Sequence, residues 1–338
     1  MAGPIAYSAP YQPPRPPGWD TVWQGLSMTW EGWDGSVWSL TDADGGVYLP
    51  RGGVRGMGTP EAEVYTSSAA GVAGARMLGA RVLPREVFWP IEVYTDQGSQ
   101  AWLDLDSAFW RTMDQEKPGV WTVSQPGAAA GAAGSRPGQR RSLDCYFVTD
   151  GGHAFEIDRS LVGWEVYAVR LVAHQPYWRG DPIVRGPWIE SEGQDFIPAT
   201  GAPPFYISEG HQAARASMPN PGDVATVAIW RVRGTDAGTA VGVGGEHTVI
   251  PFDLADDQEV VLDSDNQLAT LNRLAITHDA EGREVVEVLS SEDVTGEIEV
   301  FDGGKVPPGA SVPLDVVIAG TGAGQVSASL VPLYRRAW

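Results

Sequence analysis

The sequence predicts a mostly β protein of two domains, and three observations lead to this prediction. Gly and Pro contribute 42 and 26 of the 338 residues and lie between short apolar runs, a pattern typical of many short strands. Only one segment spaces its apolar residues as a helix does. A chain of this length exceeds one ordinary domain and suits two. We therefore expect two antiparallel β-sandwich domains, the first of which contains one α-helix.

Charge and tryptophan are unequally divided along the chain. Residues 1–185 contain 15 Lys+Arg and 20 Asp+Glu, a net charge of −5, whereas residues 186–338 contain 8 and 23, a net charge of −15. Eleven of the 14 Trp lie in the first part. This division favours a first domain built for contact and a second that stays solvated. The total charge of −20 argues against nucleic acid as a partner, because it repels a phosphate backbone.

Proline positions suggest where the domains begin and end. Residues 1–18 contain the run Pro13–Pro17 and are expected to form an extended arm. The first domain is then expected over residues 19–185 and the second over residues 186–338. Prolines at 176, 182 and 187 disfavour strand pairing across this boundary, so few backbone hydrogen bonds are expected to join the halves.

The strands expected in the first domain are short and rich in aromatic and β-branched residues. They span residues 29–31, 37–40, 84–94, 120–123, 141–148, 154–158 and 164–173. One helix is expected to begin with Asp104 or Asp106 as its N-cap and to run to Asp114. Four apolar side chains then share one face of it: Leu105, Phe109, Trp110 and Met113. The Gly- and Ala-rich residues 127–138 are expected to form a mobile hairpin tip.

After the boundary the sequence predicts strands alone. They span residues 224–233, 248–254, 259–263, 274–277, 285–288, 297–301, 311–319 and 325–332. Short strands at this spacing, with no helical pattern between them, are typical of an antiparallel sandwich.

A search for catalytic and cofactor motifs finds none that is convincing. The sequence contains no phosphate-binding loop, no Gly-x-Ser-x-Gly elbow and no His-Glu-x-x-His, so we expect no cofactor and no enzyme. Cys145 is the single cysteine and stands in an apolar run, which indicates a buried, inert thiol. No apolar run is long enough to span a bilayer, and no basic-then-apolar signal pattern is present.

Possible metal and acid sites in the sequence are better explained by ordinary structure. The five histidines are far apart and lack the spacing of metal ligands. Asp263-Ser-Asp265 opens like a calcium loop, but the later positions of that motif are filled by leucines. The acidic run Asp256–Glu259 resembles paired hydrolytic carboxylates, yet a solvated loop is the better interpretation. We therefore expect no bound metal and no catalytic residue.

Five tryptophans in the first 40 residues stand out as candidate contacts. They are Trp19, Trp23, Trp30, Trp33 and Trp38. Clustered tryptophans can stack on sugars, and they also anchor subunit interfaces. We favour the second role, so these five residues are the predicted subunit interface.

The order of motifs along the chain resembles a known family. The motifs are Pro84-Arg-Glu-Val, the helix around Phe109-Trp110, Gly119-Val-Trp-Thr-Val, and Ala173-His-Gln-Pro-Tyr-Trp-Arg-Gly180. This order resembles the N-terminal belt domain of siphophage distal tail proteins (the Dit family of minor tail proteins), particularly in phages that infect actinobacteria. Further matches resemble the galectin-like C-terminal domain of that family: Asn220 to Trp230, Val249-Ile-Pro-Phe, Glu259 to Asp263, and Tyr334 to Trp338. The long insertion at 127–138 and the Trp-rich first 40 residues depart from it.

The resemblance implies a non-enzymatic structural protein of the virion tail tip, assembled in the host cytoplasm. It implies a homo-oligomeric ring, a hexamer, that joins the tail tube protein to the tail-tip hub or baseplate proteins, with the tape measure protein as a further candidate partner. The alternative is a carbohydrate-binding module that recognises a host cell-wall glycan through the C-terminal sandwich. In the acidic half, only Trp188, Trp230 and Trp338 could serve as stacking platforms for it.

Overall fold

The computed structural model describes most of the chain. It covers residues 25–50, 52–71, 73–126, 139–151, 158–189, 216–279, 281–298, 304–320 and 324–338. The expected arm 1–18 and the expected hairpin tip 127–138 lie outside the described residues, as does most of the strands expected at 154–158 and 297–301. The prediction of a mostly β, antiparallel protein is confirmed, and the described residues contain one α-helix. That helix is too short to cross a bilayer.

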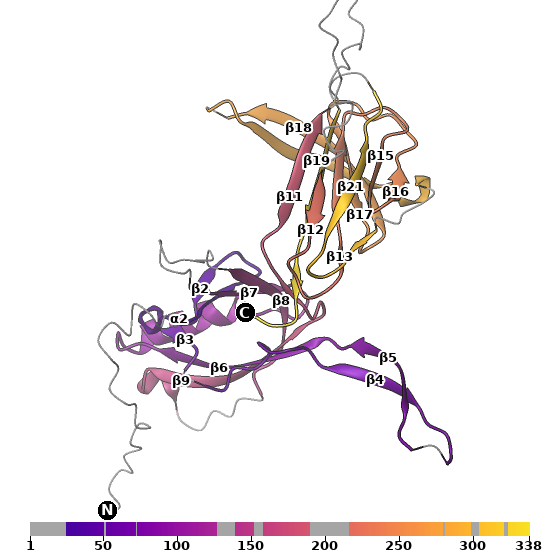
Figure 1. The fold of residues 1–338 in the computed structure, drawn as a ribbon. Helices are drawn as coiled ribbons and strands as arrows, with labels where there is room; N and C mark the ends of the chain where they lie inside the picture. Colours follow the sequence, from indigo (N-terminus) through magenta and orange to yellow (C-terminus); the bar gives the residue numbers. More distant parts are fainter. Residues whose placement is uncertain are drawn as a thin grey trace, which may run out of the picture.

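A nine-stranded antiparallel sheet forms the first body (Figure 1). Its main path runs β2-β1-β7-β8-β9-β6-β3, with β10 and β23 at the side of β8. The strands are β1 (Ser27–Glu31), β2 (Val37–Ser39), β3 (Val47–Tyr48), β6 (Arg85–Tyr94), β7 (Gly119–Ser124), β8 (Arg140–Thr149), β9 (Trp164–Ala173), β10 (Trp178–Arg179) and β23 (Leu333–Tyr334). Buried and more exposed residues alternate along β6, β7 and β9, because one face of the sheet carries the core.

The helix of this domain, α2 (Ser99–Trp110), packs against the sheet but begins and ends earlier than expected. Gly98 precedes it at a φ of 98°, without a side-chain cap. The two aspartates expected to cap it lie inside the helix and have other partners. Asp104 accepts a hydrogen bond from Gln100, and Asp106 accepts one from Tyr167 Oη at 2.7 Å. The expected apolar face is nevertheless the packed one, because Phe109 is fully buried in the core.

Two further strands form a separate ribbon that the sequence did not predict. β4 (Ala62–Ser67) pairs antiparallel with β5 (Arg76–Val82), and neither strand joins the sheets. Figure 1 shows the ribbon projecting away from both bodies of the molecule. Short 3-10 turns complete the described helical segments: η1 (Ala43–Gly45), η2 (Arg159–Leu161) and η3 (Thr295–Glu297).

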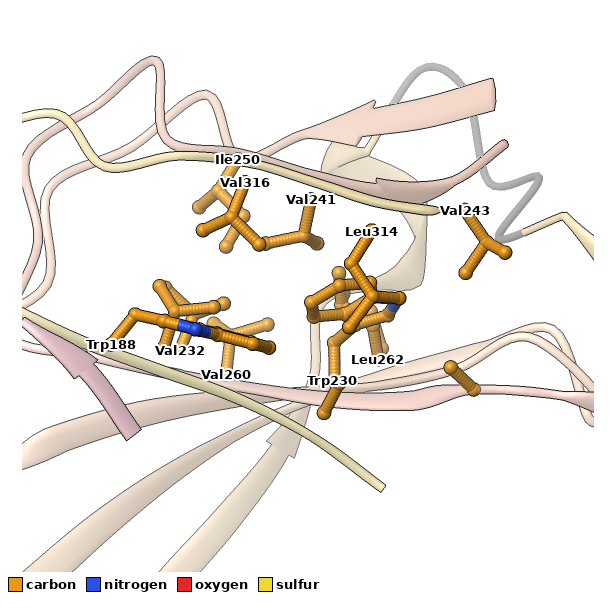
Figure 2. Close-up of a cluster of buried hydrophobic side chains, with 14 of the residues drawn as sticks. Trp188, Trp230, Val232, Val241, Val243, Ile250, Val260, Leu262, Leu314 and Val316 are labelled. Atoms are coloured by element: carbon orange, nitrogen blue, oxygen red, sulfur yellow. The ribbon is translucent and has the colours of Figure 1, made fainter. Parts of the chain in front are cut away.

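The second body is a sandwich of a six-stranded and a four-stranded sheet. The first has the order β11-β22-β14-β17-β18-β19 and the second β12-β21-β15-β16, with β13 and β20 as an extra pair. The strands are β11 (Ile183–Ile189), β12 (Ser217–Pro219), β13 (Thr226–Val227), β14 (Ile229–Arg233), β15 (Ala240–Val243), β16 (Glu246–Val249), β17 (Gln258–Asp263), β18 (Leu268–His278), β19 (Glu284–Asp293), β20 (Lys305–Val306), β21 (Ser311–Val317) and β22 (Gln325–Leu330). Figure 2 shows Val241 and Leu314 of the smaller sheet facing Trp230 and Leu262 of the larger one.

The expected division at residue 186 differs from the structure in two ways. β11 begins at Ile183, so the second body begins three residues before the expected residue 186. The last strand, β23, pairs with β10, and Tyr334 and Ala337 belong to the core of the first body. The first body therefore contains the C-terminal segment around β23, which the sequence predicted to be part of the second domain.

The expectation of few backbone hydrogen bonds between the halves is wrong at this crossing. Gly180 N–H donates to Pro332 O at 2.9 Å, and Ala337 N–H donates to Met57 O at 2.9 Å. Strands pair on both sides of Pro182, since β10 pairs with β23 and β11 pairs with β22, and Pro187 lies in a register shift of β11. The chain therefore crosses between the two bodies twice. It enters the second body at β11 and returns to the first body at β23.

Candidate interaction surface

The β4–β5 ribbon exposes several large apolar side chains of the first domain. Every residue of β4 is exposed, and so are most residues of β5. Its large apolar side chains are Val64, Tyr65, Met77 and Leu78, with exposed fractions of 53%, 44%, 61% and 64%. A two-stranded ribbon is marginally stable by itself in water, so a surface of this kind is typically covered by a partner.

The two faces of the ribbon differ in chemistry. Cross-strand pairs point to the same side of a ribbon. One side carries the pairs Ala62–Val82, Val64–Ala80 and Thr66–Met77 and is nearly apolar. The other side carries the Glu63–Arg81 pair and Tyr65, whose hydroxyl donates to Glu63 Oε2 at 2.9 Å. The apolar side is therefore the one that gains most from burial.

A second exposed apolar area lies at one end of the sheet. Tyr94 and Trp164 are cross-strand partners at the end of β6 and β9, with exposed fractions of 44% and 45%. Val166 follows on the same face of β9, and Leu161 in η2 is 77% exposed. The first domain thus presents both an exposed ribbon and an exposed patch at the sheet end.

The predicted interface tryptophans have different positions in the structure. Trp19 and Trp23 lie outside the described residues. Trp30 is 1% exposed and belongs to the core, so its side chain is not available to another subunit. It starts a row of four buried indoles, in which Trp30–Trp89, Trp89–Trp121 and Trp121–Trp178 ring centres are 5.3, 5.2 and 4.9 Å apart. Much of the tryptophan of the first domain therefore stabilises its own core.

Trp33 and Trp38 lie nearer the surface and are partly held by their own chain. The Trp33 indole N–H donates to Arg111 O at 3.0 Å, and Lys117 Nζ lies 3.9 Å from the Trp33 ring centre. Trp33 remains 39% exposed. Trp38 packs edge-on against Phe109 with ring centres 5.5 Å apart. A role of these two residues in a subunit contact stays a prediction.

Asp263 and Cys145, two groups that the sequence singled out, have structural roles. Within the described residues no group of three or more His, Cys, Asp or Glu is placed to hold a metal ion. Asp263 accepts backbone hydrogen bonds from Asp265 and Asn266, which closes the β17–β18 turn. Cys145 is fully buried, and burial raises the pKa of its thiol.

The acidic run that resembled hydrolytic carboxylates is part of a surface ion-pair set. Asp257 pairs with Arg273 at 3.3 Å and Glu259 pairs with Arg231 at 2.8 Å. Exposed pairs of this kind are worth little energetically and position side chains on the sheet surface.

The stacking platforms required by the glycan-binding alternative are not open in the second domain. Trp230 is 1% exposed, Trp188 is 7% exposed, and their rings pack together with centres 6.3 Å apart (Figure 2). Trp338 is 44% exposed, but it follows Tyr334 and Ala337, which belong to the core of the first body and not to the sandwich. Neither buried indole can stack on a sugar without opening the core.

The fold is one that a solved phage tail protein shares. The structure is similar to that of Dit (gp 19.1) of phage SPP1, described as a paradigm of the hub adsorption apparatus in phages that infect Gram-positive bacteria. The TM-score is 0.50 and the identity 14%, over 91% of this chain and 99% of that one. The phage P2 baseplate in its activated conformation gives a TM-score of 0.49 at 8% identity, over 90% and 98%. The resemblance predicted from the sequence is thereby confirmed at the level of the fold.

One curated protein is also similar in sequence. It is the minor tail protein Gp27 of Mycobacterium phage D29, 35% identical over 83 residues. The match spans 24% of this chain and 24% of that protein. No protein-family model matches the chain.

Proposed function

We propose that this chain is a structural, non-enzymatic protein of a phage tail tip that self-associates through its first domain into a closed ring, a hexamer. The observation that carries the proposal is the β4–β5 ribbon, which exposes an apolar face on a chain with the fold of a distal tail protein. In a closed ring each copy uses two different surfaces, one to contact each of its two neighbours. The Tyr94–Trp164 patch is the receiving surface on the same domain.

Charge supports association through the first domain rather than the second. Residues 186–338 have a net charge of −15, so two copies of this half repel each other at short range. Residues 1–185 have a net charge of −5, and contact there buries apolar area at little electrostatic cost. The ring would lie between the tail tube protein and the hub or baseplate proteins, with the tape measure protein as a further partner.

The test is the mass of the assembly in ribbon variants of the full chain. Val64→Glu with Met77→Glu places two charges on the apolar face of the ribbon. The matched control, Val249→Glu with Val317→Glu, changes two valines of the second domain that are 44% and 49% exposed. Native mass spectrometry should find hexamers for the wild type and the control, and monomers for the ribbon variant with an unchanged circular dichroism spectrum.

Two results contradict the proposal. A wild-type protein that stays monomeric at tens of micromolar has no self-sufficient ring. A ribbon variant that keeps the wild-type mass shows that the ribbon is not the contact.

A further inference from the structure

The six-stranded sheet of the second domain ends in a long strand with an open edge. β19 is the last strand in the sheet order, and among the described residues no strand pairs with its outer side. All ten of its residues are exposed. Its partner β18 and β19 form a hairpin that projects beyond the sandwich in Figure 1. The outer N–H and C=O groups of such a strand are available to a further strand.

The opposite edge of the same sheet is protected against strand addition. β11 contains a register shift between Arg185 and Trp188. Pro187 lies in this shift and has no N–H to donate. Folded proteins commonly protect sheet edges with irregularities and prolines of this kind. β19 contains no proline, and its bulge, opposite Arg273 and Leu274, still leaves a regular run from Glu284 to Val288.

Apolar side chains lie along the open edge. Val285, Val286, Val288 and Leu289 are 48%, 44%, 51% and 61% exposed. Val286 and Val288 lie beside Ile276 and Leu274 of β18, so an apolar strip runs across the hairpin. These four side chains leave apolar area exposed to water, which an added strand would cover.

The charges on β19 indicate which partner fits. The strand carries Glu284, Glu287, Glu292 and Asp293 and no basic residue. A second copy would bring a strand with the same four acids, within a domain part of net charge −15, which disfavours pairing between copies. Glu284 already pairs with Arg233, so a strand that carries both apolar and cationic residues would place its apolar residues beside the valines and its cations beside Glu287, Glu292 and Asp293.

We propose that the β19 edge is a docking site for an extended, basic segment of another protein, which adds to the six-stranded sheet as a seventh strand. Backbone hydrogen bonds to the outer side of β19 supply the affinity, and its mixture of branched apolar and acidic residues supplies the preference for a basic, apolar strand. This site is separate from the ring contact of the first domain and does not depend on it.

The test uses the full-length protein and a fluorescent, end-blocked peptide that repeats Lys-Val-Val, so that its lysines lie on both faces of the strand, as Glu284 and Glu287 do on β19. A second peptide has the same sequence with alternate amides N-methylated, so that it keeps its charge and loses backbone donors on one edge. Val286→Lys puts a cation in the apolar strip. Val184→Lys makes the same change on the protected β11 edge, at a valine that is 57% exposed.

We expect fluorescence anisotropy to show saturable binding of the unmodified peptide to the wild type and to Val184→Lys. Val286→Lys and N-methylation should each weaken binding about tenfold or more, because they remove the apolar contact and the backbone bonds respectively. Equal binding of both peptides would overturn the proposal, since it indicates electrostatic adsorption to an acidic surface. The proposal would also be overturned if the peptide did not bind the wild type, or if Val286→Lys and Val184→Lys lost peptide binding equally. A wild-type dimer that Val286→Lys abolishes would assign the edge to a second copy instead.

Discussion

Gly119 opens β7 directly against the indole of Trp30. A methyl group added at this position would overlap the Trp30 ring and lie 2.8 Å from Glu31 O. Because Trp30 is held edge-on by Trp89, the ring cannot move away freely. We expect Gly119→Ala to lower the free energy of unfolding by about 1–3 kcal/mol, the usual cost of overpacking a core. Urea denaturation followed by tryptophan fluorescence measures this cost.

The control for this substitution is Gly79→Ala in the exposed ribbon, where an added methyl group meets no atom within 4 Å. It should change the free energy of unfolding by less than about 0.5 kcal/mol. Equal effects at the two positions would show that the Trp30 environment adapts and that the row of indoles is not tightly packed.

Single residues also show a limit of the sequence. Trp30 and Trp33 stand three positions apart among similar neighbours, yet the first is 1% exposed and the second 39%. The pairing of β1 with β7 turns Trp30 toward the core, and this pairing joins residues about ninety positions apart in the chain. The number of tryptophans alone could not tell core residues from subunit-contact residues, because cores and interfaces both favour the tryptophan side chain.

At the scale of elements, the alternating strands β6 and β9 could be predicted and the exposed ribbon could not. β6 and β9 alternate buried and exposed residues, and the sequence located both. β4 and β5 lack this alternation because both faces of the ribbon are exposed. The helix could be placed by its apolar face, but its start could not, since Gly98 provides no side-chain cap.

The β18–β19 hairpin provides a prediction for pH. Arg233 and Glu284 form an ion pair between β14 and the hairpin, and the hydrogen bond from Arg233 lowers the pKa of Glu284 below its ordinary value of 4.5. The stabilisation is therefore present above pH 4.5 and is lost as the pH falls through the lower pKa of the folded state. Arg233→Gln should raise the pKa of Glu284 toward 4.5 in a carboxyl-carbon NMR titration.

The matched control is Arg231→Gln. It removes the neighbouring ion pair with Glu259 and leaves the Arg233–Glu284 ion pair intact. A Glu284 pKa that does not change in Arg233→Gln would mean that the ion pair does not hold the hairpin in solution.

At the scale of the whole molecule, the returning tail completes the first core. Buried Arg85 donates to Arg335 O and to the carbonyls of Gly56 and Pro176. Burial lowers the pKa of Arg85 to about 10, so the guanidinium stays charged at neutral pH. Arg141 donates to Arg336 O and lies 3.7 Å from the Tyr334 ring centre. No local pattern could predict this arrangement, because its partners lie as far as 250 positions apart.

Removal of residues 333–338 should therefore destabilise the first domain, although it leaves every residue of that domain before the boundary in place. Arg85 and Arg141 would lose acceptors, and buried Trp178 would lose its strand partner Tyr334. We expect a melting temperature lower by several degrees, with an early red shift of tryptophan emission. Tyr334→Phe is the control, since it keeps the ring over Arg141 and should melt as the wild type does. An unchanged melting temperature in the truncated chain would contradict a structural role of the tail.

The same crossing has a consequence for the timing of folding. During synthesis, the strands from β1 to β10 emerge well before β23, which follows the whole second sandwich in the chain. The acceptors for Arg85 and Arg141 are therefore missing until that sandwich has been made. The core of a nascent first domain stays incomplete until β23 and the residues after it have been translated, which happens after the second domain. A chain whose synthesis stops within the second sandwich would therefore lack part of the first core as well.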